Sequence, residues 1–232
     1  VINSGSFSLL SNYADLWGPS NENSNESIFE VQFVSGGMGE GSGFTNSFSP
    51  SSDLQTGEGG GRNRPTPDIV DSYEKGDERF KSSMDTIYVV DGDTSYARYI
   101  RKYESNPSAN YDADNNFIVF RYSDVLLMMA EASGQGTVAY DYINQVRTRA
   151  GLNSINASSP GSFEDQLLKE RRVELAFENH RWYDLLRFGK AVETMNNQFD
   201  KQGFNITIDT HNLIFPIPQR EIDLGLIQNP GY

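Results

Sequence analysis

Apolar residues recur with helical spacing in the second half of the chain, between residues 121 and 200. Ser123 is placed to cap a helix over Asp124–Ser133. A second helix is expected after Thr137, which would cap it, and this helix would stop at Gly151. Its apolar face comprises Ala139, Ile143, Val146 and Ala150. Because only a Gly-Gln-Gly link separates the two helices, the pattern predicts an antiparallel, tetratricopeptide-like hairpin.

A third helix is expected to open at Ser162, since Asp165 follows three residues later as a variant of the capping box. An apolar seam then repeats every seven residues and is continued once more before Gly189. Its members are Leu168, Leu175, Trp182 and Leu185. The spacing predicts one long helix with Trp182 in the core, followed by a short helical piece from Lys190 to Asn197.

Charged residues share the buried face of this third helix. Arg171 and Glu178 lie on the apolar seam, and Glu174 lies between them at helical spacing. Isolated charges would be costly to bury there. We therefore expect these side chains to form a paired, hydrogen-bonded set.

Residues 1–120 differ from the helical part in composition and pattern. They are rich in Gly, Ser, Asn and aromatic residues and show little helical periodicity. Asp91-Gly92-Asp93 predicts a hairpin turn between strands at Ile87–Val90 and Thr94–Ile100. Two glycine clusters, at 36–43 and 57–61, lack the Lys-Ser/Thr that a phosphate-binding P-loop needs. Long surface loops are the favoured interpretation of both clusters.

The composition limits the classes of molecule that the chain is expected to bind. The net charge of −13 would repel a nucleic-acid backbone and argues against adsorption to anionic lipid, whereas a neutral carbohydrate is compatible with it. Cysteine is absent, so the chain has neither a disulfide nor a thiolate metal site, and no cofactor is indicated.

Several motifs in fixed order resemble the SusD/RagB family, the surface glycan-binding lipoproteins of Bacteroidetes. The most informative is Lys169–Arg187, which carries charges on a buried helix face. The others are Glu26–Phe33, Asn63–Pro67, Arg121–Ala132, Tyr142–Leu152, Leu213–Asp223 and Gln228–Tyr232. The resemblance spans nearly the whole chain and makes a chance similarity improbable.

This resemblance implies an all-α, SusD-like fold with tetratricopeptide-like helices, a long irregular segment and a minor β-hairpin. Residues 1–120 would be the loop-rich, candidate ligand-binding part, and residues 121–232 the helical C-terminal region. Val1–Gly5 has the pattern of a helix end, so we expect the N-terminal half of the family architecture, with its signal peptide and lipidated cysteine, to be absent.

The resemblance also implies the function. Family members bind oligosaccharides or other nutrients at the cell surface, are anchored to the outer membrane by an N-terminal lipid, and cap a SusC-like, TonB-dependent transporter. Their helical side faces the transporter, and the ligand site is built on the irregular part. Family ligand residues vary with the glycan, so none is carried over by motif.

Candidate ligand residues are therefore chosen by position and chemistry. Sugars bind to aromatic faces flanked by side chains that hydrogen-bond hydroxyl groups. Phe44 and Phe48 follow the first glycine cluster, Arg62 and Asn63 follow the second, and Tyr96 belongs to the predicted hairpin. For any single aromatic residue, a place in the core is the competing interpretation.

One pattern suggests a metal. Asp112, Asp114 and Asn116 alternate as at the start of a calcium-binding loop. Phe117 replaces the required glycine, and Ser123 replaces the final glutamate. A solvated Asp/Asn turn is the favoured interpretation, and no metal site is expected.

Signs of catalysis are few. Glu170, Glu174 and Glu178 align at helical spacing and could suggest glycoside hydrolysis, but an ion network is favoured. Its expected cations are Arg171, Arg172 and Arg181. His180 is interpreted as structural, and His211 has no partner suggested by the sequence. We predict a non-catalytic glycan-binding protein; a surface glycoside hydrolase and a protein-binding helical scaffold are the alternatives.

Overall fold

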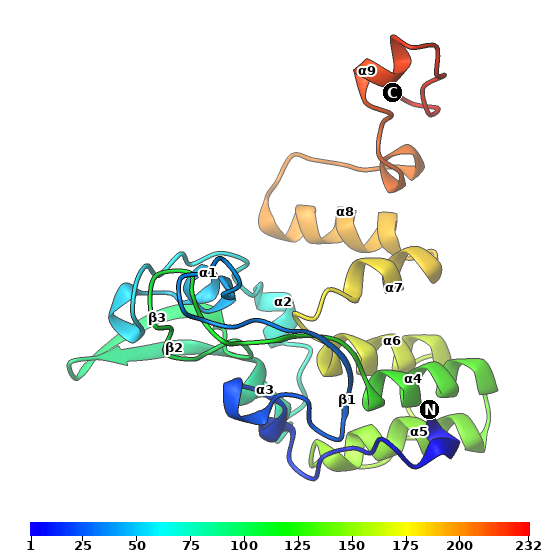
Figure 1. Ribbon diagram of the computed structural model, residues 1–232. Coiled ribbons are helices and arrows are strands. Elements are labelled where there is room, and N and C mark those ends of the chain that lie inside the picture. Colours follow the sequence, from blue (N-terminus) through cyan, green and yellow to red (C-terminus); the bar gives the residue numbers. More distant parts are fainter. The chain divides into compact units, whose positions relative to one another are not determined.

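The computed structural model describes all 232 residues and divides the chain into two compact units, Val1–Glu178 and Asn179–Tyr232. Nine α-helices and two antiparallel sheets of two strands each make up most of the regular structure (Figure 1). Helices predominate, although the chain is not built from helices alone. No helix is both long enough and apolar enough to cross a bilayer.

Three helices form the helical part of the first unit: α4 (Tyr122–Ser133), α5 (Thr137–Arg149) and α6 (Phe163–Glu174). Helices α4 and α5 pack along each other as a hairpin, and α6 contacts both. Apolar side chains at helical spacing fill the space between them, as the periodicity predicts. These buried residues are Leu126, Leu127, Ala130, Ala139, Ile143, Val146 and Leu167.

The start of each of these helices tests a predicted cap. Ser162 does cap α6, because its Oγ accepts a hydrogen bond from the Asp165 amide at 3.1 Å and donates to the Asp165 carboxylate at 2.7 Å. The other two predicted caps are wrong. The Ser123 hydroxyl accepts from the Arg121 guanidinium instead of a helical amide, and Thr137 is already the first residue of α5.

The strands lie in the first unit: β1 (Ser27–Val31), β2 (Met84–Val90), β3 (Asp93–Ile100) and β4 (Phe117–Arg121). β1 pairs with β4, and β2 pairs with β3, both antiparallel. The predicted hairpin is confirmed. Its turn residues Asp91 and Gly92 have φ of 51° and 90°, the positive values that a type I′ turn requires at both central positions.

Shorter helices fill the rest of the first unit. They are α1 (Phe44–Phe48), α2 (Pro67–Val70), α3 (Arg79–Ser83) and the 3₁₀ turns Ile2–Ser4, Tyr13–Leu16, Pro19–Asn21 and Ser52–Leu54. Long irregular segments connect these helices, as expected for the loop-rich residues 1–120.

The single long helix predicted after Ser162 is wrong. Helix α6 ends at Glu174, and α7 (Arg181–Arg187) begins only after an irregular segment in which Phe177 and Asn179 have φ of 66° and 67°. The Glu178 amide donates to Leu175 and not to the carbonyl of Glu174, as a continuing helix would require. Trp182 accordingly lies at the start of a new helix, and it is 36% exposed instead of completing the seam.

Tyrosine hydroxyl groups satisfy the carbonyls that the helix end leaves unpaired. Tyr73 donates to the carbonyl of Val173 at 3.2 Å, Tyr13 to that of Glu174 at 2.9 Å, and Tyr103 to that of Phe177 at 3.0 Å. All three tyrosines come from the loop-rich part of the chain. The end of α6 is therefore set by tertiary contacts that helical periodicity does not contain.

The second unit contains α7, α8 (Ala191–Gln202), the 3₁₀ turn Thr210–Leu213 and α9 (Gln219–Ile222). Helix α8 continues past the predicted end at Asn197, and Gly203 with φ of 72° terminates it. The Asn196 side chain binds both the amide and the carbonyl of Ile208, at 2.8 and 2.9 Å. These two bonds hold the following segment against α8.

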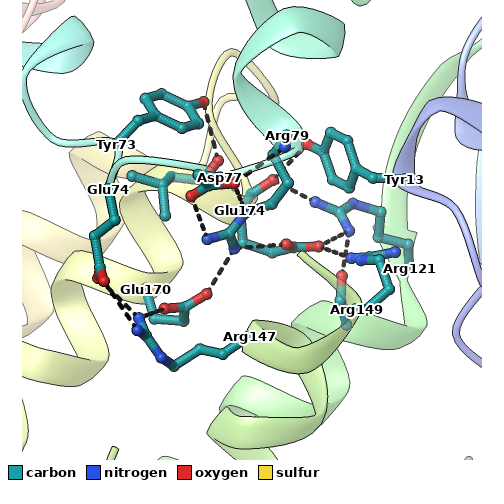
Figure 2. Close-up of polar contacts among 12 residues, drawn as sticks. Tyr13, Tyr73, Glu74, Asp77, Arg79, Arg121, Arg147, Arg149, Glu170 and Glu174 are labelled. Atoms are coloured by element: carbon teal, nitrogen blue, oxygen red, sulfur yellow. Dashed lines mark hydrogen bonds and ion pairs between the residues drawn. The ribbon is translucent and has the colours of Figure 1, made fainter. Parts of the chain in front are cut away.

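A buried ion network occupies the centre of the first unit (Figure 2). Glu174 lies at its middle, with a side chain that is 0% exposed, and pairs with Arg79 at 2.9 Å and with Arg121 and Arg149. Burial alone would raise the pKa of Glu174, but the Arg149, Arg121 and Arg79 cations outweigh it and hold the pKa well below its ordinary value. Glu174 is therefore an ionised carboxylate shared by three arginines.

Glu170 extends the network one helical turn earlier on α6. It pairs with Arg79 at 2.6 Å and with Arg147 at 3.0 Å. Asp77 also binds Arg79, at 2.7 Å, and Glu74 binds Arg147 at 3.0 Å near the surface. Every buried charge in this part has an opposite partner, which is the condition for burying it.

Glu178 extends the network in the other direction. It pairs with Lys102 at 2.6 Å and with Arg121 at 2.7 Å. Burial lowers the pKa of Lys102 to about 8, against the opposing effect of the Glu178 carboxylate. The Lys102 ammonium also lies 4.5 Å from the Trp17 ring centroid and 5.4 Å from that of Tyr13, within the range of cation–π attraction.

The alternating residues Asp112, Asp114 and Asn116 hold the first glycine cluster in place. Their side chains accept hydrogen bonds from main-chain amides: Asp112 from Gly36 and Gly37 at 2.9 Å each, Asp114 from Ser35 at 2.7 Å, and Asn116 from Phe33 at 2.8 Å. Alternate residues of an extended segment point to the same side, so their spacing matches successive amides of residues 33–37. Asp112 and Asn116 are buried, which the predicted solvated turn did not anticipate.

We expect Glu174→Gln to lower the free energy of unfolding by about 3–5 kcal/mol near neutral pH, because three buried arginines lose their shared carboxylate. The folded-state pKa of Glu174 lies below the ordinary 4.5, so its contribution is present above pH 4.5 and is lost as the pH falls through the folded-state pKa. Urea unfolding over a pH series would show the gap between variant and wild type narrowing in acid.

Glu74→Gln is the matched control, since the Glu74 side chain is 38% exposed and its buried partner Arg147 keeps Glu170 as a second carboxylate. We expect it to cost at most about 1 kcal/mol. Equal losses for the two variants, or a Glu174→Gln gap that does not change with pH, would contradict the central role of Glu174.

We expect Gly41→Ala to lower the free energy of unfolding by about 1–3 kcal/mol through overpacking. A Cβ atom at Gly41 would lie 2.1 Å from Oδ1 and 2.7 Å from Cα of Asp112. Asp112 would have to move, and the amides of Gly36 and Gly37 should then exchange hydrogen faster. Gly136→Ala is the control, because its Cβ would meet no atom within 4 Å and its φ is 179°. Unchanged exchange at both amides in Gly41→Ala would refute the clash.

Candidate functional site

A hollow of about 340 Å³ combines aromatic and polar side chains in the loop-rich part of the first unit. We call it the aromatic pocket. It lies where α1, the 49–55 loop, the end of β3 and residues 103–105 meet. Its lining comprises Thr45, Phe48, Ser49, Leu54, Gln55, Tyr99, Ile100, Tyr103, Glu104 and Ser105.

Stacked aromatic rings form one wall of this pocket. Phe44 and Phe48 lie one turn apart on α1, and their rings stack with centroids 5.7 Å apart and planes inclined by 21°. The Tyr103 ring lies 5.6 Å from Phe48 and 5.1 Å from Phe44. Phe117 of β4 packs behind, 5.4 Å from Phe44. The wall therefore has a supported aromatic face, and Phe48 and Tyr103 line the hollow.

Buried side chains of α1 fix the loops around the pocket. The Asn46 amide group donates to the carbonyls of Thr56 and Glu58 at 2.9 Å each and accepts from the amide of Tyr111 at 2.8 Å. Thr45 donates to the carbonyl of Tyr103 at 2.7 Å. Because these bonds satisfy main-chain groups of irregular segments, they order loops that have no ladder of their own.

Polar groups form the opposite rim. The Glu104 carboxylate accepts a hydrogen bond from Arg101 Nε at 3.0 Å. Burial raises the pKa of Glu104, against the effect of the Arg101 cation. Burial also raises the pKa of Tyr99 to about 12, so its hydroxyl remains protonated. The Glu104 carboxylate is thus the charged group of the lining. The Gln55 side chain lies in the same lining, held by hydrogen bonds to the Glu58 carbonyl at 2.9 Å and from the Ser49 hydroxyl.

This arrangement suits a ligand with an apolar face and a polar edge. A pyranose ring has both, since its CH groups pack on aromatic rings and its hydroxyls bind acids and amides. Such a site offers stacking and hydrogen bonding, and it needs no covalent step.

The five predicted ligand residues differ in where they lie relative to the aromatic pocket. Phe48 lines the aromatic pocket, and Phe44 supports it from behind. Arg62 lies beside α1, where its amide donates to the carbonyl of Ser47 at 2.8 Å, and its side chain and that of Asn63 are exposed. Tyr96 is 84% exposed on β3, and it does not line the pocket.

Other residues of the pocket were not among the predicted ligands. Tyr99 and Tyr103 belong to a run of tyrosines on and after the hairpin, but periodicity does not distinguish them from the outward-facing Tyr96. Gln55 and Glu104 lie in irregular segments without any recognisable motif. Their common place depends on long-range packing, for which one sequence gives no signal.

The aligned glutamates of α6 and the segment after it do not form an open carboxylate pair. Glu170, Glu174 and Glu178 are each at most 3% exposed and bound to cations, so the predicted ion network is confirmed. Two of the predicted partners are wrong, because Arg171 pairs with Asp124 at 2.7 Å and Arg172 with Asp68. Cations from other elements bind the three glutamates.

The two histidines lie in the second unit. His180 immediately precedes α7. His211 has a partner that the sequence did not suggest, since its Nδ1 contacts the Asp209 carboxylate. No group of three or more His, Cys, Asp or Glu side chains is arranged to hold a metal ion.

Solved structures resemble the chain over almost its whole length. A laminarin-binding SusD-like protein superposes with a TM-score of 0.79 and 31% identity, over 98% of this chain and 54% of that one. Surface glycan-binding protein A from Bacteroides thetaiotaomicron, in complex with laminarihexaose, superposes with a TM-score of 0.81 and 25% identity, over 98% and 57%.

Sequence comparison gives the same relationship. SusD-like protein P25 of Formosa agariphila is 28% identical over an alignment 271 residues long. The alignment covers 97% of this chain and 51% of that protein. The chain thus spans about half the length of these relatives. A family-level comparison matches residues 84–232 to the SusD family. Since this match covers more than half of the sequence, the chain belongs to the SusD family.

Proposed function

We propose that this chain binds a glycan without cleaving it and serves nutrient capture at the bacterial cell surface. The observation that carries the proposal is the aromatic pocket, where Phe48 and Tyr103 face Gln55 and Glu104. A laminarin-binding relative at 31% identity supports a carbohydrate ligand, and laminarin-type β-glucan is the first candidate. Binding would be an equilibrium capture by stacking and hydrogen bonds.

In this proposal the predicted ligand residues contribute in different ways. Phe48 stacks on a sugar ring, and Phe44 keeps the Phe48 ring in place. Arg62 and Asn63, exposed beside α1, would contact hydroxyl groups of a sugar that extends from the pocket. Tyr96 would offer a further exposed ring on the hairpin.

A non-catalytic role is supported by the state of the glutamates. Glycoside hydrolysis needs two carboxyl groups that flank the scissile bond. Glu170, Glu174 and Glu178 are buried and paired with cations, so they are not available to a substrate. The hydrolase alternative would therefore require other carboxylates. The protein-binding scaffold alternative would leave the aromatic pocket without a ligand.

The remaining parts of the proposal follow from family membership. Residues 1–120 would be the ligand-binding part and residues 121–232 the helical region, with α4, α5 and α6 as tetratricopeptide-like helices. This helical side would dock on a SusC-like, TonB-dependent transporter. The whole protein would be held at the outer membrane by an N-terminal lipid.

We expect Phe48→Ala to weaken binding of laminarihexaose at least tenfold, because losing one stacked ring costs about 1–1.5 kcal/mol beyond its buried area. Titration calorimetry on this chain, with an assay for released reducing ends, would measure affinity and cleavage together. Phe29→Ala is the control, since Phe29 is 55% exposed on β1 and does not line the pocket.

Equal affinities of the two variants would remove the aromatic pocket from the proposal. Release of reducing ends by the wild-type chain would overturn the non-catalytic role. If laminarihexaose does not bind, a panel of plant, host and microbial glycans decides whether another glycan does. Failure of the whole panel would favour the protein-binding scaffold.

A further inference from the structure

A second hollow of about 300 Å³ adjoins the aromatic pocket. We call it the Trp17 hollow; its lining includes Trp17, Gly18, Lys81, Ser82, Arg101 and Glu104. Glu104 lines both hollows, so the two meet at this side chain. All of these residues belong to the first unit.

Trp17 contributes a firmly held aromatic ring to this hollow. The ring lies 4.5 Å from the Lys102 ammonium and packs edge-on against Tyr13 at 5.6 Å and Tyr103 at 6.5 Å.

The polar groups of the Trp17 hollow are mainly hydrogen-bond donors. Lys81, on the last turn of α3, makes no ion pair in the chain. Arg101 gives its Nε to Glu104 at 3.0 Å and lies 3.7 Å from Asp85 through Nη1, so its Nη2 group remains available. Glu104 is the one carboxylate in the lining. Donors around a single acceptor complement the hydroxyl and ring oxygens of a sugar.

We propose that the aromatic pocket and the Trp17 hollow are successive subsites of one track for a linear oligosaccharide. One sugar stacks on Phe48 in the aromatic pocket. The oligosaccharide then passes Glu104, and a later sugar packs against the Trp17 ring and accepts hydrogen bonds from Lys81 and Arg101 in the Trp17 hollow. This inference rests on the proposed function and adds the length of the ligand and the residues that read it.

The track predicts that affinity depends on ligand length. A short oligosaccharide would occupy the aromatic pocket alone, whereas a longer one would also fill the Trp17 hollow. Linked subsites add their binding energies without a second loss of translational freedom. Variants of the two hollows should therefore differ in which lengths they affect.

The test is titration calorimetry of this chain with β-1,3-linked glucose oligosaccharides from laminaribiose to laminarihexaose. We expect Trp17→Phe, which keeps a ring beside Lys102 but replaces the indole with a smaller ring, to weaken binding of the hexaose about two- to tenfold, the effect of part of one aromatic contact. The shortest oligosaccharide that binds should be unaffected. Phe48→Ala should instead weaken every length.

Lys81→Gln gives a second variant at an exposed position, where folding is not at risk. It should reduce affinity for long oligosaccharides only, and Lys75→Gln, an exposed lysine outside both hollows, should change nothing. Thermal unfolding of each variant checks that the fold is retained.

Three outcomes would overturn the track. Trp17→Phe and Lys81→Gln could leave the hexaose affinity unchanged, they could weaken all lengths by the same factor, or the wild-type affinity could be independent of length. In each case glycan binding and the effect of Phe48→Ala would persist, so the proposed function would survive. If no glycan binds the wild-type chain, the proposed function fails, and this inference fails with it.

Discussion

The shared burial of Glu174 among Arg79, Arg121 and Arg149 is the constraint on which the first unit depends. Ionised groups are stable at such depth only when each finds an opposite charge and its remaining hydrogen bonds. The three arginines belong to α3, β4 and α5, so one carboxylate of α6 fixes the relative positions of four elements. Well-packed apolar residues would hold these elements together equally well, but they would specify their register less strictly.

The buried ion network also positions the candidate site. Residues 101–105 run past its edge, and consecutive side chains serve different purposes. Lys102 turns inward to Glu178, whereas Tyr103 forms the aromatic wall and binds the Phe177 carbonyl through its hydroxyl. Arg101 and Glu104 pair at the rim that joins the two hollows. The loops of the candidate site thereby gain support from a buried core, which would lower the entropic cost of binding the proposed glycan.

Membership of the SusD family agrees with separate roles for the helical and the loop-rich parts of the chain. The helical part carries the charges that organise the core, and the loop-rich part carries the aromatic pocket. The spacing of the carboxylates on α6 and just after it, taken alone, is compatible with an enzyme. Their burial assigns them to the architecture, because each is neutralised by cations that lie far away in the sequence.

The sequence by itself determined the local features: the helices α4, α5 and α6, the cap at Ser162, the Asp91–Gly92 turn and the need to pair the buried glutamates. These depend on periodicity and on contacts a few residues apart. Tertiary structure alone decided the end of α6, the partners of each carboxylate, and which aromatic rings meet. Tyr13 reaches the Glu174 carbonyl across 161 residues, and periodicity carries no information on such a distant donor. For the same reason Phe48 could be selected by position, whereas Tyr99, Tyr103 and Glu104 join it only through long-range packing.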